Sequence, residues 1–453
     1  MAFNPDWVKS FKPADRVDMT NQLPNQDERR IVLAGGMIFD GSGQPLFEGD
    51  VLIAGNRIKA VVAATESWAP PEDALRIELS GRTIMPGMVE GHAHISFTGA
   101  ANLMDLVMMP VEENLIAAIC NAALLLDHGF TSLVSAAASK PRLDVAVRNA
   151  IEAGLIVGPR MLAASQEITP TGNLGDLDQA HFPIPESARF AYICDGPDAF
   201  RLAARRFARE GVDTLKVNIS GDRDWGHMGA DANATLIDDD ELAALVNVAH
   251  GRGLRVAGHA TSAGSVKMCV RHGVDIIYHA ALADSEALDM VESVKDSVFV
   301  APAVGFPYAY LHEGEKYGLH LKPHARRGLE EELEMTAHNM GELHRRGVRI
   351  VPGGDYGLVC TPQGRNARDL ELFVTEFGFS PADALVAATS HGGAMMGRGD
   401  ELGQLRAGWL ADLIVVDGDP IEDIAVLQDR ERIDLVMKDG QLYRNKLLVK
   451  DGR

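Results

Sequence analysis

The sequence is poor in aromatic residues and in cysteine, and both shortages narrow the class of protein. Phe, Trp and Tyr make up 6% of its 453 residues. Its four cysteines, Cys120, Cys194, Cys269 and Cys360, are far apart and show no CxxC spacing. This usage predicts reduced structural thiols and argues against a disulfide-stabilised scaffold.

Basic residues are also scarce relative to acidic ones. The chain has 43 Lys and Arg against 64 Asp and Glu, a net charge of −21 that is dispersed along the sequence. Such a surface repels phosphate backbones, so we expect no nucleic-acid partner. The first thirty residues lack the basic and apolar regions of a signal peptide, and no apolar run is long enough to span a bilayer. We therefore expect a cytoplasmic protein without a membrane partner.

Length and composition fit a globular protein with more than one unit. Apolar residues make up 46% and charged residues 24% of the chain, close to the averages of soluble globular proteins. A chain of this length exceeds one ordinary core, and a barrel of about 250 residues plus a smaller domain would account for it.

Both ends of the sequence are rich in short β-prone runs. Residues 31–84 alternate such runs with turns, as in IVLAGGMIFDG and DVLIAGNRIKAVV, and residues 404–453 repeat the style in ADLIVVDGDP and IDLVMKDGQLYRNKLLV. Period-two patterning broken by Gly and Asn is typical of antiparallel strands. We predict one small β-sandwich domain built from both ends, preceded by an arm at residues 1–30.

The middle of the chain, residues 85–403, alternates apolar strand-like runs with amphipathic helical stretches. This alternation is typical of a parallel sheet covered by helices, and eight such units predict an α/β fold with a (β/α)8 TIM barrel. The predicted strands lie near residues 88–95, 130–136, 160–166, 214–220, 254–260, 274–280, 298–304 and 348–354. Long connections at residues 167–195, 221–238 and 305–325 are predicted to form loops that wall the functional site.

Potential metal ligands stand at the ends of these strands. In PGMVEGHAHI, His92 and His94 are two residues apart, so both imidazoles point to the same side of a strand. Alone, this pair could equally be structural or surface histidines. His259 in VAGHA, His279 in IIYHA and Asp355 in IVPGGDYG each close a later strand. Because the carboxyl ends of barrel strands meet at one face, we expect these side chains to converge there.

Lys216 is a lysine inside an otherwise apolar strand, VDTLKVNIS. Burial lowers the pKa of an unpaired ammonium, so that a neutral amine becomes accessible and can capture carbon dioxide as a carbamate. A carbamate is an anionic oxygen ligand able to bridge two metal ions. The alternative for a strand lysine is an ion pair or a side chain that reaches the solvent.

These motifs resemble those of the amidohydrolase superfamily over about residues 31–440. The resemblance rests on PGMVEGHAH, GVDTLKVNIS, GHA, YHA and GGD, and on the tail GRGDELGQLRAGWLADLIVVDGDP. Within the superfamily the chain is most similar to the imidazolonepropionase-like and prolidase-like branch, which includes Xaa-amino-acid dipeptidases, ochratoxin-type amidases and urea or carbamate hydrolases. The resemblance implies a TIM-barrel metallohydrolase, commonly a homo-oligomer, that cleaves an amide-like C–N bond of a small-molecule substrate.

The resemblance also implies a ligand set and its roles. His92, His94 and Asp355 would hold one divalent metal ion, commonly zinc, and His259 and His279 would hold a second. Lys216 would carry the bridging carbamate, and Asp355 would also be the catalytic acid and base. Trp225, His227 and Tyr278 are predicted to lie in or beside the pocket, where each could contact substrate or serve as a wall residue.

Three positions depart from the pattern of the branch. A second histidine often follows the fifth strand near the substrate carboxylate, but Thr261 stands there, and a TGGH-like segment reads Thr171-Gly172-Asn173-Leu174. Both changes favour a neutral amide, urea, carbamate or cyclic amide over a dipeptide. Glu90 replaces the aspartate that usually precedes the HxH motif, and we expect it to orient a histidine or to be structural.

Two other functions remain open at this point. One is a cyclic amide or amidine hydrolase, or a deaminase, of the same superfamily with a single metal ion, against which Lys216 argues. The other is a scaffold protein without catalysis, whose mark would be lost ligands, and none is lost here.

Overall fold

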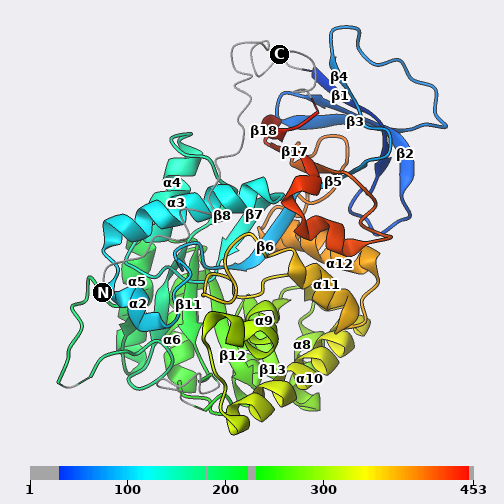
Figure 1. Cartoon of the computed structure of the whole chain (residues 1–453). Coiled ribbons are helices and arrows are strands. Elements are labelled where there is room, and N and C mark those ends of the chain that lie inside the picture. The colour runs from blue at the N-terminus through cyan, green and yellow to red at the C-terminus, as the bar shows by residue number, and fades with distance from the viewer. Residues whose placement is uncertain (1–29, 180, 223–230, 448–453) are drawn as a thin grey trace.

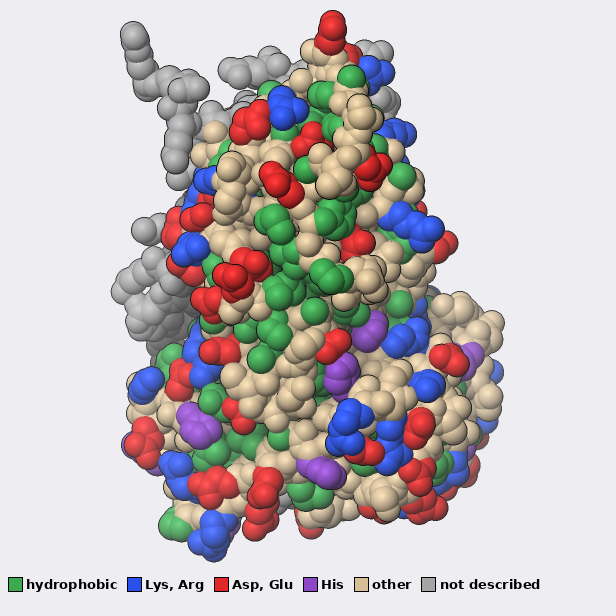
Figure 2. Space-filling view, turned by 90° about the vertical axis from the view of Figure 1, so that its right-hand side faces the viewer, with side chains coloured by type: hydrophobic (Ala, Val, Ile, Leu, Met, Phe, Trp, Pro, Cys, Tyr) green, Lys and Arg blue, Asp and Glu red, His purple; other side chains and the backbone are tan. Residues whose placement is uncertain are grey.

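The computed structural model describes residues 30–179, 181–222 and 231–447. The predicted N-terminal arm therefore lies outside the described residues, except for Arg30, which opens the first strand. In the described part of the chain, no helix is both long enough and apolar enough to cross a membrane. Figure 2 shows acidic and basic side chains interspersed over one face of the molecule, as the dispersed charge of the sequence predicts.

Strands from both ends of the chain form one eight-stranded sheet (Figure 1). The two ends join where Leu413–Val416 (β16) pairs antiparallel with Thr83–Pro86 (β5). Buried Ile, Leu and Val side chains of these strands form a core cluster of their own. The strands are β1 Arg30–Ile38, β2 Phe47–Ala54, β3 Arg57–Ala63, β4 Leu75–Glu78, β5 Thr83–Pro86, β16 Leu413–Val416, β17 Ile433–Lys438 and β18 Gln441–Asn445.

The middle of the chain forms two parallel sheets, of three and seven strands. All eight predicted strands are present in the predicted order, which confirms the α/β class. The smaller sheet holds β6 Met88–Ala93, β7 Phe130–Ser135 and β8 Arg160–Leu162. The larger sheet holds β9 Ala164–Thr169, β10 Ala191–Ile193, β11 Thr214–Asn218, β12 Arg255–Ser262, β13 Ile276–Leu282, β14 Phe299–Ala301 and β15 Arg349–Ile350.

The two parallel sheets are continuous with each other on one side and in contact on the other. Only Ala163 separates β8 from β9, so a single stretch of chain pairs with β7 and then with β11. At the opposite side, the Gly91 amide in β6 donates a hydrogen bond of 2.8 Å to the carbonyl of Pro352, just beyond β15. The carboxyl ends of the first and last parallel strands therefore meet.

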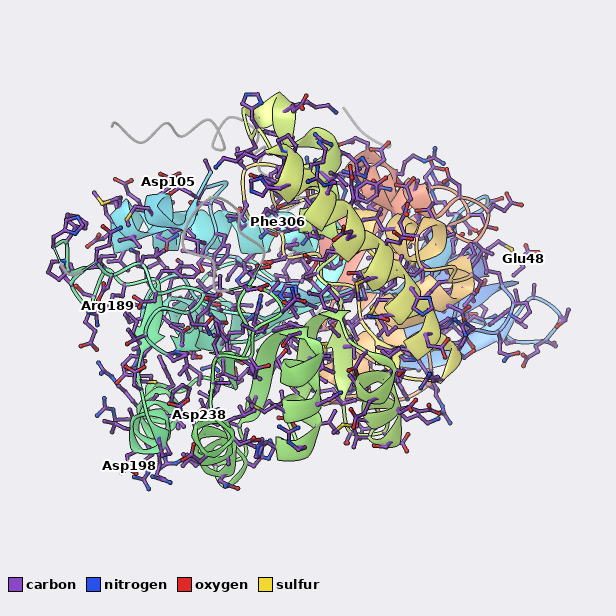
Figure 3. All side chains as sticks on the ribbon, turned by 90° about the horizontal axis from the view of Figure 1, so that it is seen from below. Glu48, Asp105, Arg189, Asp198, Asp238 and Phe306 are labelled. Carbon is purple, nitrogen blue, oxygen red and sulfur yellow. The ribbon has the colours of Figure 1, made fainter. Side chains whose placement is uncertain are left out.

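Helices follow these strands and cover them. Figure 3 shows α5, marked by Asp198, beside α6, marked by its N-cap Asp238. Asp238 and Glu241 form a capping box that begins α6, and Gly211 in the left-handed conformation ends α5. The helices of this region are α2 Leu103–Met108, α3 Val111–Asp127, α4 Leu143–Glu152, α5 Pro197–Glu210, α6 Asp239–His250, α7 Ala263–His272, α8 Ser285–Ser293, α9 Gly305–Glu313, η2 Gly314–Tyr317, α10 Pro323–Arg345, α11 Arg368–Thr375, α12 Pro381–Val386, η3 Ala387–His391 and α13 Gly392–Met395, followed near the C-terminus by η4 Ile424–Gln428 and η5 Arg430–Arg432.

Two of the three predicted loops contain regular structure. The connection at residues 305–325 is mostly helical, with α9 and η2, so its prediction as a loop was wrong. Proline at position 307 lies in the first turn of α9, where a missing amide is tolerated. The connection at residues 167–195 begins inside β9 and contains β10 near its end, which leaves irregular chain at residues 170–179 and 181–190. Part of the connection at residues 221–238 lies outside the described residues.

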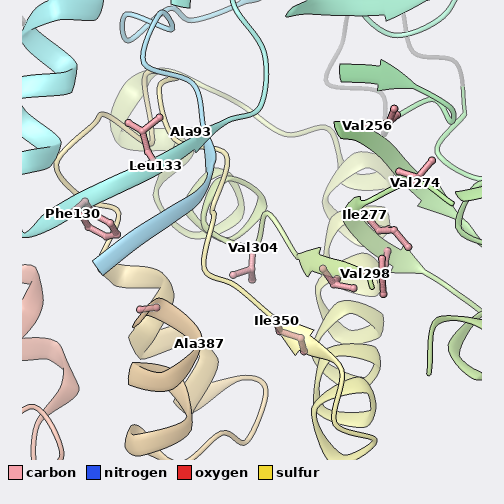
Figure 4. Packing of buried hydrophobic residues seen from close by; sticks show 14 of the residues in the cluster. Ala93, Phe130, Leu133, Val256, Val274, Ile277, Val298, Val304, Ile350 and Ala387 are labelled. Carbon is pink, nitrogen blue, oxygen red and sulfur yellow. The ribbon is translucent and has the colours of Figure 1, made fainter. Parts of the chain in front are cut away.

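The largest hydrophobic core lies between the parallel strands and their helices. Figure 4 shows side chains that contribute to it from β6, β7, β12, β13 and β15. Phe130, Leu133, Val256, Ile277 and Ile350 are each at most 1% exposed. This packing fixes the strands on which the functional side chains stand.

Candidate metal centre

The six predicted metal ligands stand in or just after five parallel strands, at their carboxyl ends. His92 is in β6, and His94 is the first residue after that strand. Lys216 is in β11, His259 in β12 and His279 in β13. Asp355 follows β15. The structure therefore places all six on the face that parallel α/β folds use for function.

His92, His94 and Asp355 form the tightest part of this cluster. One potential ligand atom from each lies within 4.8 Å of the others. The Nε2 atoms of His94 and His92 lie 3.0 Å and 3.8 Å from Asp355 Oδ1. Two imidazoles and a carboxylate at this spacing are a common ligand set for a divalent transition metal.

The other two histidines continue the same cluster. The ring centroids of His259 and His279 are 4.2 Å apart, and that of His279 is 5.4 Å from that of His92. The four imidazoles are therefore linked by ring contacts of 4.2 Å to 5.4 Å.

Lys216 lies beside them and is almost completely buried. Its side chain is among the largest that are under 2% exposed, and Nζ lies 4.5 Å from the centroid of the Tyr278 ring. Burial lowers the pKa of Lys216, and the negative charges of Glu167 and Asp355 partly oppose this shift. A neutral amine is therefore more accessible here than on a surface lysine, as the sequence predicts.

Hydrogen bonds fix which ring nitrogen of two histidines offers a lone pair. Nδ1 of His94 lies 3.2 Å from the Ala137 carbonyl and Nε2 of His259 lies 3.2 Å from the Gly221 carbonyl. A carbonyl only accepts, so these nitrogens carry the hydrogen, and Nε2 of His94 and Nδ1 of His259 keep the lone pair. Nε2 of His94 then faces the Asp355 carboxylate at 3.0 Å, a contact that either a proton on Nε2 or a bound cation would stabilise.

Buried ring nitrogens without partners, lowered histidine pKa values and unusual backbone angles also fit a metal centre at these residues. Nε2 of His279 and Nδ1 of His92 are buried without a hydrogen-bond partner among the described residues. Burial lowers the pKa of His279 to about 3 and that of His92 well below its usual value, so both rings are neutral, the form that binds metal. His279 and Asp355 have positive φ angles of 73° and 60°, an unusual conformation that is typical of functional sites. The residues present therefore fit a divalent metal centre.

Buried carboxylates support the ligands from behind. Glu90 Oε1 accepts a hydrogen bond of 3.0 Å from the His92 amide, and Glu90 Oε2 accepts one of 2.8 Å from Asn366. Burial and the nearby Asp369 raise the pKa of Glu90 to about 8. Glu90 thus holds the backbone of the HxH motif, a role close to the orienting one expected for it.

Glycine allows the segment before Asp355 to approach the first strand. A Cβ atom on Gly353 would lie 2.5 Å from the Cβ of His92, a distance that real side chains do not adopt. The Gly353 amide and the Tyr356 hydroxyl both donate to Asp369, at 3.0 Å and 2.9 Å. The position of Asp355 is therefore fixed from α11.

Of the three predicted substrate contacts, the structure describes only Tyr278. Tyr278 is fully buried, stacks on His92 with ring centroids 3.9 Å apart and donates its hydroxyl to the Gly91 carbonyl. The structure thus makes Tyr278 a packing residue behind the ligands and gives no support to a substrate contact. Trp225 and His227 lie outside the described residues.

Sequence reasoning missed one acidic residue in this region. Glu167 in β9 pairs in register with Lys216 in β11, so both side chains point to the same face. Asn218, two residues after Lys216, donates a hydrogen bond of 2.7 Å to Glu167. Glu167 stands among other polar residues in β9, ASQEIT, so the sequence gives it no special signal, and the register that joins it to Lys216 is not visible there.

Comparison with known proteins decides the family. The model of the amidohydrolase family matches residues 83–443, which include all six candidate ligands. The chain belongs to the amidohydrolase family. Membership of this family makes the chain a hydrolase of amide-type bonds, and the family is generally metal-dependent.

Individual relatives of this amidohydrolase cover nearly its whole length. It is 26% identical to ochratoxinase of Aspergillus niger, over 93% of this chain and 88% of that protein. It is 23% identical to imidazolonepropionase of Chromobacterium violaceum, over 81% of this chain and 84% of that protein. A solved structure of a Xaa-Pro dipeptidase with methionine in its active site matches with a TM-score of 0.80 at 26% identity, covering 92% of this chain and 100% of that one.

Proposed function

We propose that this amidohydrolase is a metal-dependent enzyme that cleaves an amide-like C–N bond of a small molecule: an amide, an N-acyl amino acid, a urea or a carbamate. The observation that carries the proposal is the convergence of four imidazoles, a carboxylate and a buried lysine at one edge of the parallel strands. The ochratoxinase and dipeptidase relatives support an amide-type substrate.

The residues divide into two metal sites in this proposal. His92, His94 and Asp355 would hold one divalent ion, and His259 and His279 would hold the other, both probed best with zinc. Lys216, as its carbamate, would supply a further anionic oxygen ligand. When bound, such ions polarise a carbonyl and lower the pKa of water towards neutrality.

Asp355 manages the protons of the reaction. Its carboxylate lies 3.0 Å from His94 and is 22% exposed, so it can reach both the ligands and a substrate. It accepts the proton of the attacking water and passes that proton to the leaving nitrogen when the tetrahedral intermediate collapses. The nitrogen of an amide is a poor leaving group, so this proton donation is essential.

The second candidate is hydrolysis of a cyclic amide or amidine, or deamination, with one metal ion. The imidazolonepropionase relative favours it. The number of metal ions separates the two candidates, because Lys216 has no role as a bridge in a centre with one ion.

The experiment is metal analysis of purified protein, followed by a turnover screen. The panel contains N-acyl amino acids, aryl ureas, carbamates and cyclic amides, each tested with zinc-loaded and with chelator-treated protein. Two metal ions per chain and chelator-sensitive turnover of an open-chain member support the proposal. A zinc-loaded protein that turns over none of the panel contradicts it.

The remaining features of the proposal concern architecture and setting. The continuity of β8 with β9 and the Gly91–Pro352 hydrogen bond support a closed (β/α)8 barrel, with the sheet from the two chain ends as a β-sandwich. The net charge of −21 supports a protein without a nucleic-acid partner. We also propose that the protein is a homo-oligomer, that it lies in the cytoplasm and that it does not associate with membranes.

A further inference from the structure

One side of helix α5 carries a concentration of arginine that the metal centre does not use. Leu202, Arg205, Arg206 and Arg209 are spaced three and four residues apart in α5, so they lie on one side of that helix. Arg252, in the turn that follows α6, lies opposite them. These five residues line a surface cavity of about 570 Å³, which we refer to as the arginine cavity.

The arginine cavity lies towards the opposite end of the parallel strands from the metal ligands. Helix α5 ends at Glu210 and leads into β11, which begins at Thr214, and Arg252 precedes β12, which begins at Arg255. Thr214 and Arg255 pair in register at the amino ends of these two parallel strands. Because the candidate metal ligands stand at the carboxyl ends, the cavity is a separate place on the molecule.

The charge of the arginine cavity is opposite to that of the whole molecule. Four of the described residues that line it are arginines and none is acidic, in a chain with a net charge of −21. Arg205 and Arg209 are both exposed and stand four residues apart in one helix, a spacing at which like charges repel each other. A negatively charged ligand between the arginines would replace this repulsion with attraction.

Arg206 is held in place by its neighbours. Its Cζ atom lies 5.2 Å from the centroid of the Tyr192 ring, and Nη1 donates a hydrogen bond of 3.4 Å to the Tyr192 hydroxyl. Arg206 also forms an ion pair with Glu186 and lies 3.9 Å from a carboxylate oxygen of Glu210. These carboxylates balance the charge of Arg206, so the excess positive charge of the cavity comes from its other three arginines.

The stretches of chain outside the described residues have no excess of negative charge to offer the cavity. Residues 1–29, 180, 223–230 and 448–453 together hold seven acidic and seven basic side chains. Residues 223–230 also lie in the connection that leads into α6, whereas Arg252 follows the other end of that helix. A ligand with a net negative charge therefore complements the cavity better than these balanced stretches do.

We propose that the arginine cavity binds a small ligand with two linked phosphate groups, either free pyrophosphate or a diphosphate ester. The planar fork of a guanidinium matches phosphate oxygens, and several arginines in one cavity can contact more than one phosphate. The volume of the cavity is within the range of about 300–1,000 Å³ that is usual for small-molecule sites. Leu202, which is 58% exposed, offers an apolar wall to the organic part of an ester. This site is independent of the proposed hydrolase function.

Isothermal titration calorimetry with pyrophosphate, ADP and inorganic phosphate tests the site. We compare the wild type with the double variant Arg205→Gln/Arg209→Gln, which removes two charges from the cavity. The control is Arg271→Gln/Arg345→Gln, which removes two charges from α7 and α10. All four arginines are exposed, so both variants should keep the fold. Because pyrophosphate also binds metal ions, each titration is run on zinc-loaded and on chelator-treated protein.

We expect pyrophosphate and ADP to bind the wild type with the same affinity whether or not zinc is present. Inorganic phosphate should bind at least about tenfold more weakly than pyrophosphate, because one phosphate reaches fewer arginines. The cavity variant should bind pyrophosphate and ADP at least about tenfold more weakly than the wild type. The control variant should stay within about twofold of the wild type, because distant exposed charges are screened. Tighter binding of ADP would identify an ester as the ligand, and tighter binding of pyrophosphate would identify the free anion.

Several results would overturn the anion site. Equal affinity of the wild type and the cavity variant would mean that the anion binds elsewhere, and binding only to zinc-loaded protein would mean that it binds at the metal centre. Absence of binding, or equal affinity for inorganic phosphate and pyrophosphate, would also contradict the proposal. A cavity variant with a changed oligomeric state in sedimentation velocity would show instead that the cavity is an interface between copies of the chain. None of these results bears on the hydrolase function.

Discussion

Asp355 contacts His94, and in the proposed function it also closes the first metal site and moves the proton. Its backbone lies in the left-handed region with a φ of 60°, which only asparagine, aspartate and glycine adopt readily. Substitution by asparagine therefore removes the charge and the basicity of the side chain while it keeps the preferred backbone conformation.

We predict that Asp355→Asn lowers kcat by at least about 10³-fold, because the leaving nitrogen no longer receives a proton. Thermal unfolding should shift little. On one preparation, steady-state kinetics measures kcat, differential scanning calorimetry measures the unfolding temperature, and zinc analysis measures the metal content. Turnover within tenfold of the wild type would refute the proton-transfer role of Asp355.

Asp144 allows a prediction about pH. Its carboxyl group is buried, and burial raises its pKa to about 6, against the hydrogen bond from Ser135. The pKa is about 3.8 in the unfolded chain, so the folded state keeps its proton to higher pH. The contribution of Asp144 to the free energy of unfolding is therefore most favourable at low pH and falls as the pH rises through about 6.

Replacement of Asp144 by asparagine removes this dependence. Relative to the wild type, Asp144→Asn should gain about 1.4 kcal/mol in free energy of unfolding between about pH 5 and about pH 8. Urea unfolding of both metal-free proteins at the two pH values gives the difference. If the free energies of unfolding of the two proteins differ by the same amount at both pH values, the pKa of Asp144 is not raised in the folded state.

At the scale of the element, α11 holds the segment that carries Asp355. Asp369 in the first turn of α11 accepts from the Gly353 amide and the Tyr356 hydroxyl, one on either side of Asp355. Asp369→Ala should lower zinc affinity about 10-fold to 100-fold, because groups that orient metal ligands carry effects of this size.

Glu371→Ala provides the control for this prediction. Glu371 lies in the same helix but accepts a hydrogen bond from Gln428, away from the metal centre. Competition with a fluorescent zinc chelator measures the affinity of both variants. Equal affinities for the two would mean that α11 does not position Asp355.

The elements also show what a sequence can and cannot reveal. Apolar runs predicted eight strand segments that are all present, because burial on both faces leaves a strong signal, but they did not reveal the short strand β10. Five of the candidate ligands were predicted because each stands at a strand end, and Lys216 because it is a lysine inside an apolar strand. The pairing of Glu167 with Lys216 was not predicted, since register depends on contacts between distant segments.

Other local features depend equally on tertiary contacts. The helix α9 was taken as a loop because its Gly, Pro and aromatic residues, GFPYAYLHE, give almost no amphipathic pattern. Tyr278 was predicted to lie in or beside the pocket, as a substrate contact or as a wall residue. Its side chain stacks on the His92 ring, a contact that depends on tertiary packing.

At the scale of the whole molecule, buried ion pairs connect the parallel strands with the sheet from the chain ends. Arg160 in β8 pairs with Asp412 just before β16 and with Asp439 just after β17. The Asp412 side chain is only 1% exposed. Removal of Arg160 would leave this carboxylate buried without its charge partner.

We predict that Arg160→Met lowers the free energy of unfolding by about 3–5 kcal/mol, the usual cost of breaking a buried pair from one side. Zinc binding should persist at room temperature, because Arg160 lies at the opposite end of the strands from the ligands. Arg201→Met is the control, because its partner Asp198 is 97% exposed. Equal thermal stability of the two variants would show that the Arg160 pairs do not hold the two parts together.

The central claim is that six side chains from four strands and the segments that follow β6 and β15 build a single metal centre. A crystal structure of zinc-loaded protein with anomalous data at the zinc edge tests it most directly. We predict two anomalous peaks about 3.5–4 Å apart among His92, His94, His259, His279 and Asp355, with carbamate density on Lys216 between them. Zinc bound elsewhere, or an unmodified Lys216 turned away from the histidines, would contradict the proposed centre.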